Sequence, residues 1–167
     1  MIHYEILNKA EKDHWLPRMF DLLYANMQTV APGELPYEGE KQQWLENVSP
    51  ALEKAPRQVL LCLADKDLVG YVQYYTRGEL LMVEEVQLRK DYHRSFLFYR
   101  ICSHLLKTIP DQIRVAEAYA EKRNRYSQKL MQKLGMEILG EEGPFLHLRG
   151  PAGPIRDFLQ SKSAGPF

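Results

Sequence analysis

Three consecutive strand-length segments near the middle of the chain constrain its fold most. Residues 59–64 form a continuous apolar run of strand length. The turn-forming residues 65–67 separate this run from residues 68–76, which are rich in β-branched and aromatic side chains. Arg77-Gly78 then supplies a second tight turn before residues 80–88. Three such segments joined by tight turns predict an antiparallel meander.

Helical and strand patterns flank this meander on both sides. Apolar residues recur at helical spacing before and after it, and a Pro/Gly-rich break covers residues 29–36. The expected order is strand 2–7, helices 11–28 and 39–54, the three meander strands, helix 94–109, strand 114–120, helix 124–134 ending at Gly135, and a closing strand pair at 136–139 and 145–148. This order predicts an α/β fold with a single mixed, mostly antiparallel sheet flanked by helices.

The length and the charge limit the organisation and the partners. A chain of 167 residues is expected to form one domain, here residues 1–149, and the proline-containing segment 150–167 is expected to be a peripheral C-terminal arm with a helical turn at 155–160. The 22 basic and 22 acidic side chains cancel, which argues against a nucleic-acid partner. No apolar run approaches about 18 residues, and the N-terminus lacks signal-peptide character, so we expect no membrane partner and a cytoplasmic location.

The charge is distributed unevenly along the chain. Residues 1–83 carry 8 basic and 12 acidic side chains, and residues 84–167 carry 14 and 10, which gives −4 and +4. Two differently charged halves are compatible with an anionic cofactor and a cationic substrate. Cys62 and Cys102 lie within apolar runs, which favours buried, unreactive thiols. The five histidines show no metal-ligand spacing, so no metal site is expected.

The order of elements and three sequence blocks resemble the GNAT N-acetyltransferase superfamily over about residues 2–149. The blocks are Asp-Leu-Val-Gly-Tyr at 67–71, Val-Gln-Leu-Arg-Lys-Asp-Tyr at 86–92, and the segment 124–136, which runs from Asn124 to Leu-Gly-Met. The resemblance implies transfer of an acetyl group from acetyl-CoA to a primary amine by direct attack, without a metal. The acceptor would be a small-molecule amine, a peptide N-terminus or a lysine, and a homodimer is left open.

The resemblance also implies a coenzyme A site at the turn that precedes helix 94–109. Backbone N–H groups at a helix N-terminus bind phosphates, and glycines in this family let the backbone approach them closely. Both glycine positions are phenylalanine here, which leaves the donors in place but could crowd the diphosphate or remove the site. The residues expected to bind the cofactor are Val86, Leu88, His93, Arg94, Ser95, Phe96, Leu97, Phe98 and Asn124.

Two clusters of basic residues adjoin this region. Each is either a solvated surface or compensation for the phosphate charges of the coenzyme. Asn124 likewise has two interpretations, as a ligand of the pantetheine arm or as a helix N-cap. The clusters are Arg89, Lys90, His93 and Arg94 at the turn, and Lys122, Arg123, Arg125 and Lys129 around the start of helix 124–134.

The candidate catalytic residues are Glu84, Glu85 and Tyr119. Paired acids at 84–85 resemble those of spermidine/spermine acetyltransferases, where they engage the amine. Because adjacent strand residues point to opposite faces, at most one of them is expected in the cleft; the alternative is one exposed Glu and one in a salt bridge.

The position at which many GNAT enzymes carry a tyrosine acid, seven residues after the asparagine, is Met131, which cannot donate a proton. Tyr92, Tyr119 and Tyr126 are the possible substitutes. Tyr119 is preferred because strand alternation places it opposite Ala118 and Ala120, or else it packs in the wall of the cleft.

The aromatic and methionine residues of the first two helices could line the acceptor pocket or belong to the core, with the segment 32–36 between those helices as a lid. These residues are Trp15, Tyr24, Met27, Tyr37 and Trp44.

Two alternatives to acetyl transfer remain. One is a non-catalytic GNAT-like module that binds coenzyme A or another ligand, and the other is an acyltransferase that uses a different acyl-CoA.

Overall fold

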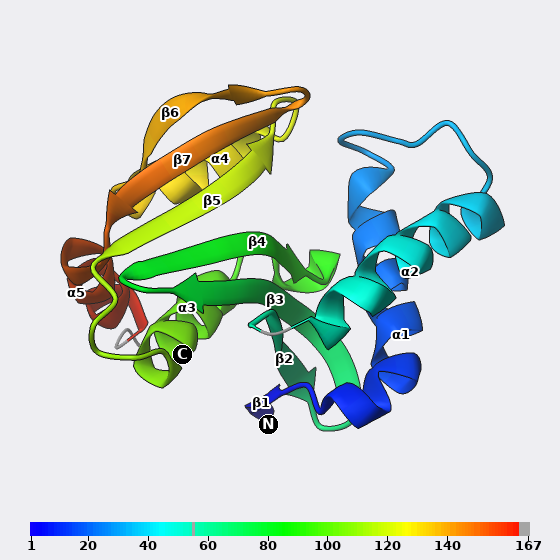
Figure 1. Ribbon diagram of the computed structural model, residues 1–167, viewed down its shortest axis with the longest axis horizontal. Coiled ribbons are helices and arrows are strands. Elements are labelled where there is room, and N and C mark those ends of the chain that lie inside the picture. Colours follow the sequence, from blue (N-terminus) through cyan, green and yellow to red (C-terminus); the bar gives the residue numbers. More distant parts are fainter. Residues whose placement is uncertain (55, 164–167) are drawn as a thin grey trace.

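The computed structural model describes residues 1–54 and 56–163, and within them seven strands form one sheet in the order β1-β2-β3-β4-β5-β7-β6 (Figure 1). Every neighbouring pair is antiparallel except β4–β5, which is parallel. The predicted mixed, mostly antiparallel sheet is therefore confirmed. The strands are β1 (Ile2–Ile6), β2 (Gln58–Ala64), β3 (Asp67–Arg77), β4 (Leu80–Leu88), β5 (Val115–Glu121), β6 (Glu137–Glu142) and β7 (Phe145–Pro151).

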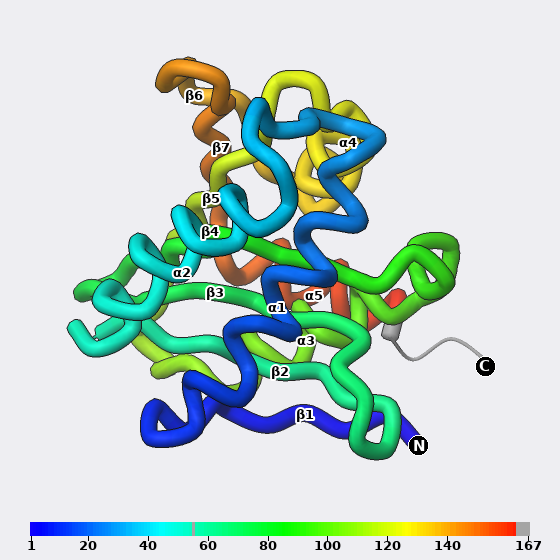
Figure 2. The backbone as a smooth tube through the Cα atoms, turned by 90° about the vertical axis from the view of Figure 1, so that its right-hand side faces the viewer, coloured from blue at the N-terminus to red at the C-terminus, as the bar shows by residue number. Residues whose placement is uncertain are grey.

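Helices cover both faces of the sheet. Figure 2 shows α1 and α2 crossing in front of β2, β3 and β4, whereas α3 and α5 lie behind them. The helices are α1 (Lys12–Met27), α2 (Tyr37–Glu53), α3 (Leu97–Thr108), α4 (Arg125–Lys133) and α5 (Ala152–Ser163), with short 3₁₀ turns at Lys9–Glu11 and Lys90–Tyr92.

The sheet separates two hydrophobic cores because side chains alternate between its faces. The fully buried Leu60 and Val72 face the core that α3, α4 and α5 complete. The equally buried Leu61 and Tyr71 face the core formed with α1 and α2. The meander predicted from residues 59–88 therefore contributes side chains to both cores.

The helix predicted at 94–109 is α3, and the rows predicted to be apolar are buried in it, including Leu97, Ile101 and Leu105. The helix begins three residues later than the pattern suggested. Gly135 follows α4 as expected, with a φ of +98° that favours glycine at the end of a helix.

The segment after residue 149 differs from the expected peripheral arm. Residues 152–163 form α5, whose side chains Ala152, Ile155 and Leu159 are buried against α3 and β7. Pro154 does not prevent this helix because it lies in the first turn, where the backbone N–H has no partner within the helix. Segment 150–163 is therefore packed against α3 and β7 and shares their hydrophobic core, and the last four residues of the predicted arm, 164–167, lie outside the described residues.

The parallel strands β4 and β5 are paired over only part of their length. Residues 80–83 of β4 pair with residues 115–118 of β5, and the two strands diverge beyond Val83 (Figure 1). One edge of residues 84–88 is consequently not covered by β5. None of the helices in residues 1–54 and 56–163 has the length and apolarity needed to cross a bilayer.

Candidate active site

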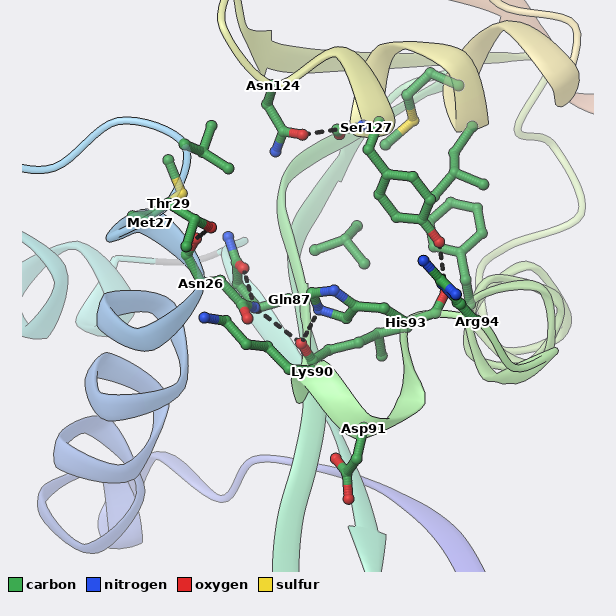
Figure 3. Close-up of a pocket in the computed structure, with 17 residues that line it drawn as sticks. Asn26, Met27, Thr29, Gln87, Lys90, Asp91, His93, Arg94, Asn124 and Ser127 are labelled. Atoms are coloured by element: carbon green, nitrogen blue, oxygen red, sulfur yellow. Dashed lines mark hydrogen bonds between the residues drawn. The ribbon is translucent and has the colours of Figure 1, made fainter.

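A cavity of about 530 Å³ lies between the end of β4, the turn that leads into α3, and α4 (Figure 3). We call it the turn cavity. Both polar or charged side chains and apolar side chains line it. Its lining includes Asn26, Val86, Leu88, Lys90, His93, Arg94, Phe98, Asn124, Tyr126, Ser127 and Met131.

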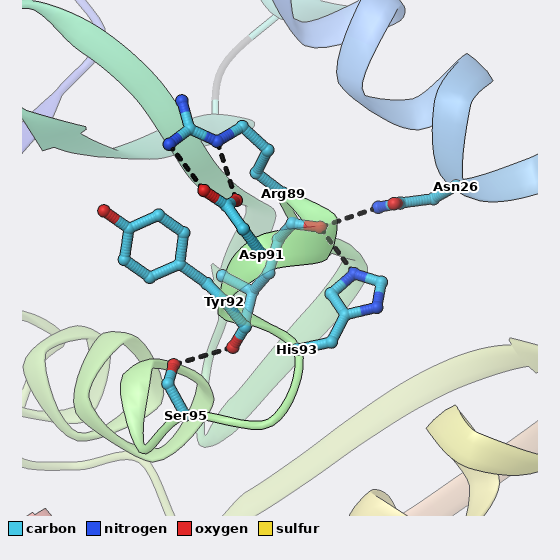
Figure 4. Close-up of polar contacts among 7 residues, drawn as sticks. Asn26, Arg89, Asp91, Tyr92, His93 and Ser95 are labelled. Atoms are coloured by element: carbon cyan, nitrogen blue, oxygen red, sulfur yellow. Dashed lines mark hydrogen bonds and ion pairs between the residues drawn. The ribbon is translucent and has the colours of Figure 1, made fainter.

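The carbonyl oxygen of Leu88, at the end of β4, connects α1 and the turn to this strand through hydrogen bonds. It accepts hydrogen bonds from the side chains of His93 (Nε2, 2.7 Å) and Asn26 (Nδ2, 2.8 Å), as Figure 4 shows. Since a carbonyl oxygen only accepts, Nε2 of His93 carries a proton. Asn26 Nδ2 also donates to Gln87 Oε1 at 2.9 Å, so α1 is tied to the last two residues of β4.

The basic residues of the turn have different environments. Arg89 makes a two-point ion pair with Asp91 at 2.8 and 2.9 Å and does not line the cavity (Figure 4). Lys90 and Arg94 do line it, and neither has an ion-pair partner among the residues that the structure describes. Ser95 Oγ donates to the carbonyl of Tyr92 and accepts the N–H of Leu97 at 3.2 Å, which organises the start of α3.

Six of the nine predicted cofactor residues line the turn cavity: Val86, Leu88, His93, Arg94, Phe98 and Asn124. Ser95, Phe96 and Leu97 do not. Phe98 is 6% exposed and packs in the core, whereas Phe96 is 44% exposed and is not part of the cavity lining. The two phenylalanines therefore differ, and only Phe98 contributes a surface to the cavity.

The start of α4 forms the opposite wall. Asn124 Oδ1 accepts the backbone N–H of Ser127 at 3.1 Å, so the N-cap interpretation of Asn124 is confirmed (Figure 3). Tyr126 stacks on His93 with ring centroids 6.1 Å apart and donates its hydroxyl proton to the His93 carbonyl. Tyr126 is one of the possible proton donors expected from the sequence, and it lines this cavity. Asn26 and Gln87 were not expected there, because the contact between them joins residues remote in sequence.

The basic cluster at the start of α4 does not face the turn cavity. Lys122 pairs with Glu141 at 2.6 Å, and Arg123 pairs with Glu121 at 2.9 Å. Neither these two residues nor Arg125 and Lys129 line the turn cavity. For this second cluster the structure favours the alternative of a solvated surface, except that Arg123 lines the space between β4 and β5.

A second cavity of about 450 Å³ lies where β4 and β5 diverge, beneath α1 and α2. We call it the sheet cavity. All three predicted catalytic residues, Glu84, Glu85 and Tyr119, line it. The two cavities meet, because six residues belong to the lining of both: Met27, Val86, Gln87, Asn124, Ser127 and Met131.

Both glutamates enter the sheet cavity, contrary to the expectation that at most one could. Gln73 pairs with Glu85 and Tyr74 with Val83, so Glu84 is the extra residue of a β-bulge. A bulge interrupts the alternation of side chains and lets two consecutive residues face the same cavity.

The two carboxylates have different partners. Glu84 forms a salt bridge with Arg57 at 2.5 Å, and its pKa is raised by burial against the opposing effect of Arg57. Glu85 accepts a hydrogen bond from the hydroxyl group of Tyr71 and has no cation partner in the described part of the chain. Burial raises the pKa of Glu85 to about 7, although the Tyr71 hydrogen bond opposes the shift. A carboxylate with this pKa exchanges protons near neutral pH.

Tyr119 both lines the sheet cavity and packs in its wall. Ala118 and Ala120 are buried on the other face of β5, as predicted. The ring of Tyr119 stacks on His147 at 4.7 Å, and burial together with a hydrogen bond to Glu142 raises its pKa. The packing of Tyr119 in the wall is therefore observed, and its role as a proton donor stays a prediction.

The two cysteines are in environments that keep their thiols unreactive. Burial raises the pKa of both Cys62 and Cys102 to about 12, which keeps the thiols protonated. Within residues 1–54 and 56–163, no group of three or more His, Cys, Asp or Glu side chains is arranged to hold a metal ion.

No protein-family model matches the sequence, and no curated protein matches it. Solved acetyltransferase structures nevertheless superpose over most of the chain. PaiA N-acetyltransferase from Thermoplasma acidophilum, in complex with coenzyme A, is 13% identical, with a TM-score of 0.71 over 90% of this chain and 99% of that chain. An acetyltransferase from Thermus thermophilus is 14% identical, with a TM-score of 0.70 over 90% and 97%. The Escherichia coli ribosomal-protein-S18-alanine N-acetyltransferase is 10% identical, with a TM-score of 0.63 over 91% and 94%.

These similarities establish the fold. The seven-stranded sheet, the helices on its two faces and the divergence of β4 from β5 are those of a GNAT fold. The fold predicted from the three sequence blocks is thereby confirmed.

Proposed function

We propose that this protein transfers an acetyl group from acetyl-CoA to a primary amine. The observation that carries the proposal is the junction of the two cavities beside Glu85, a carboxylate with a pKa of about 7 and no cation partner among the described residues. The turn cavity would receive the acyl donor and the sheet cavity the amine. The fold shared with acetyltransferases, including one in complex with coenzyme A, supports this assignment.

The turn cavity fits the chemistry of coenzyme A. Lys90 and Arg94 supply positive charge near the start of α3, where a helix N-terminus favours a diphosphate. Phe96 lies outside the cavity lining and would not crowd such a group, and Phe98 would pack against it from the core side. The bound cosubstrate would supply an activated thioester, with Val86, Gln87 and Asn124 at the junction.

Glu85 is the proposed proton acceptor. A primary amine is protonated at neutral pH and must lose a proton before it attacks a carbonyl carbon. Because the pKa of Glu85 is near 7, its carboxylate is partly ionised at neutral pH and can accept that proton directly or through water. Glu84 is paired with Arg57, so its charge is already balanced and Glu85 is the better candidate to meet the amine.

The departing thiol needs a proton or leaves as the thiolate. Met131 lines both cavities but has no proton to give. Tyr119 is the proposed proton donor from the wall of the sheet cavity. A thiol with a pKa of about 8.5 can also leave as the thiolate without such a donor.

Isothermal calorimetry with acetyl-CoA, followed by a thiol-release assay over a panel of amines, tests the proposal. We expect acetyl-CoA to bind and at least one amine to stimulate release of free coenzyme A. Glu85→Gln should retain binding and lose amine-dependent release, because Glu85 does not line the turn cavity. Absence of binding at millimolar acetyl-CoA would overturn the enzyme assignment.

Met131 favours a second candidate, a non-catalytic module that binds coenzyme A, because it stands where a proton donor is common in this fold. Such a module would bind coenzyme A and acetyl-CoA alike and release no thiol with any amine. An acyl-chain panel tests the third candidate, an enzyme for a different acyl donor, since that enzyme would show faster release with a longer acyl-CoA than with acetyl-CoA.

A further inference from the structure

The side-chain amide of Gln87 has an orientation that its hydrogen bonds fix. The Asn26 atom 2.8 Å from the Leu88 carbonyl oxygen must be the nitrogen Nδ2, because that oxygen only accepts. The same Nδ2 donates to Gln87 at 2.9 Å, so the Gln87 atom that faces it is the acceptor Oε1. The other end of this amide is therefore the donor Nε2, which has no hydrogen-bond partner among the residues that the structure describes.

Gln87 lies between the proposed proton acceptor and the proposed acyl-donor site. It pairs with Tyr71, which donates its hydrogen bond to Glu85, so the two side chains of β4 lie on the sheet face that α1 and α2 cover. Gln87 lines both cavities, whereas Glu85 lines only the sheet cavity and Leu88 only the turn cavity. Along β4 a proton acceptor is therefore followed, about 6–7 Å further on, by an amide donor at the junction.

Two other side chains at the junction carry donors. Figure 3 shows Asn124 and Ser127 at the start of α4, across the space from Asn26 and Gln87. The hydroxyl group of Ser127 makes no hydrogen bond in the described part of the chain, so its proton can rotate. Donors that are oriented before the reaction stabilise developing charge best. Gln87 combines a fixed orientation with a place on the same strand face as Glu85.

We propose that Gln87 is a catalytic residue whose Nε2 donates a hydrogen bond to the acyl oxygen of the thioester while the amine attacks. The inference rests on the proposed function and deepens it. The amine nitrogen bonds to the acyl carbon, and the π electrons of the C=O bond move onto the oxygen, where Nε2–H stabilises the negative charge. The C=O bond then reforms and the C–S bond breaks. The sulfur leaves as a thiolate or takes a proton from Tyr119 or water, and the amine proton passes to Glu85.

Two substitutions separate this donor from the tie between β4 and α1. Gln87→Met removes the donor and the tie, whereas Gln87→Glu keeps an oxygen for Asn26 Nδ2 and has no N–H. With the best amine of the panel, we expect both variants to lower kcat by about 10²-fold. The Kd of acetyl-CoA in Gln87→Met should stay within about threefold, because the charge that Nε2 stabilises develops only during attack. Recovery of the rate in Gln87→Glu would show that the tie alone matters and would overturn the proposal.

Controls distinguish Gln87 from other donors. Gln42→Met makes the same change on an exposed residue of α2 that lines neither cavity, and it should keep the rate of the unmodified protein. Ser127→Ala removes the hydroxyl donor on the opposite side of the junction. A larger fall in kcat in Ser127→Ala than in Gln87→Met would assign the acyl oxygen to α4 and refute the role of Gln87.

Hydroxylamine tests the donor without the proposed base. It is largely unprotonated at neutral pH, so no proton has to be removed before it attacks. Glu85→Gln should therefore keep most of the thiol release that hydroxylamine causes, whereas Gln87→Met should lose about 10²-fold of it. Release with hydroxylamine that is undiminished in Gln87→Met would contradict the proposal.

Asn26 is a positioning residue in this arrangement, because it holds the oxygen of the Gln87 amide. Asn26→Ala should lower kcat in the unmodified protein and lower it less in Gln87→Met, since part of its effect passes through Gln87. Equal factors in the two backgrounds would overturn the positioning role.

The outcomes also separate this inference from the proposed function. Amine-dependent release that Gln87→Met leaves unchanged defeats the inference and leaves the proposed function standing. Release that depends on Gln87 with hydroxylamine, and none with any amine of the panel, defeats the proposed function and leaves the inference standing. Absence of release with every nucleophile defeats both.

Discussion

The buried phenol of Tyr71 on β3 donates a hydrogen bond to the carboxylate of Glu85 on β4. Tyr71 is fully buried in the core beneath α1 and α2, so its hydroxyl group has a fixed place from which to hold that carboxylate at the floor of the sheet cavity. A hydrogen bond donated to the charged form of an acid favours that form and lowers its pKa. Tyr71 is therefore a positioning residue that also moderates the pKa of Glu85.

Tyr71→Phe should raise the pKa of Glu85 further above its ordinary value, because burial remains and the opposing hydrogen bond is lost. We expect the acidic limb of the pH profile of kcat/KM to move to higher pH by on the order of one unit. NMR titration of the Glu85 carboxyl carbon gives the same quantity without a substrate. Tyr74→Phe is the control, since Tyr74 is buried on the same strand and lines neither the turn cavity nor the sheet cavity. A uniform fall in rate at an unchanged pKa would leave Tyr71 with a packing role only.

Glu85 should make the protein less stable as the pH rises. Its pKa is about 7 in the folded protein and 4.5 as a free group, so between these values the folded state binds more protons than the unfolded state. The free energy of unfolding must then decrease with rising pH across this window, by roughly 3 kcal/mol for a shift of this size. Glu85→Gln removes the titrating group, and chemical denaturation should find the variant gaining stability relative to the unmodified protein from pH 5 to pH 8. If the difference in unfolding free energy between the variant and the unmodified protein stays constant from pH 5 to pH 8, the shifted pKa of Glu85 is contradicted.

Arg94→Glu should weaken the binding of acetyl-CoA, because it places a negative charge in the turn cavity where the phosphates are proposed to lie. We expect a loss of about tenfold or more, and the loss should shrink at high salt. Arg125→Glu makes the same charge change on an exposed residue of α4 outside this lining and serves as the control. Calorimetry measures both. Equal weakening by the two variants would indicate a general charge effect rather than a site at the turn.

Phe98→Ala should cost about 3–5 kcal/mol of stability, because the ring is buried in the core and its removal leaves a cavity. Phe96→Ala should cost less than about 1 kcal/mol, because that ring is 44% exposed. The two substitutions delete the same atoms two residues apart, so thermal or chemical denaturation compares burial alone. An unchanged melting temperature in Phe98→Ala would refute the packing of Phe98.

Tyr119→Phe should lower kcat about tenfold, on the order of 1.4 kcal/mol in the barrier, if its hydroxyl group supplies part of the proton transfer to the departing thiol. The affinity for acetyl-CoA should hardly change, because Tyr119 lines the sheet cavity and not the turn cavity. The stacking on His147 is retained in phenylalanine, so stability should be similar. Steady-state kinetics over a pH range measures the effect, and an unchanged rate and pH profile would remove Tyr119 from the mechanism.

Local patterns were sufficient for most of the elements. The meander, the two apolar rows of α3, the N-cap at Asn124 and the C-terminal Gly135 each depend on residues within a few positions of one another. The same local reasoning failed at Glu84, because the bulge is a property of how β4 pairs with β3 and leaves no mark in either strand alone. It failed also at α5, where burial against α3 and β7 decides that a proline-containing terminal segment is helical and internal.

The sequence by itself determined the order of the elements, the buried faces and the approximate place of the site, since periodicity and turn chemistry act over short distances along the chain. Only the tertiary structure decided which polar groups meet. The pairs Arg57–Glu84, Tyr71–Glu85, Asn26–Leu88 and His93–Tyr126 join residues from 14 to 62 positions apart. Their partners are chosen by strand register and by the packing of α1 and α4 on the sheet, and the burial that this packing imposes sets the pKa of Glu85.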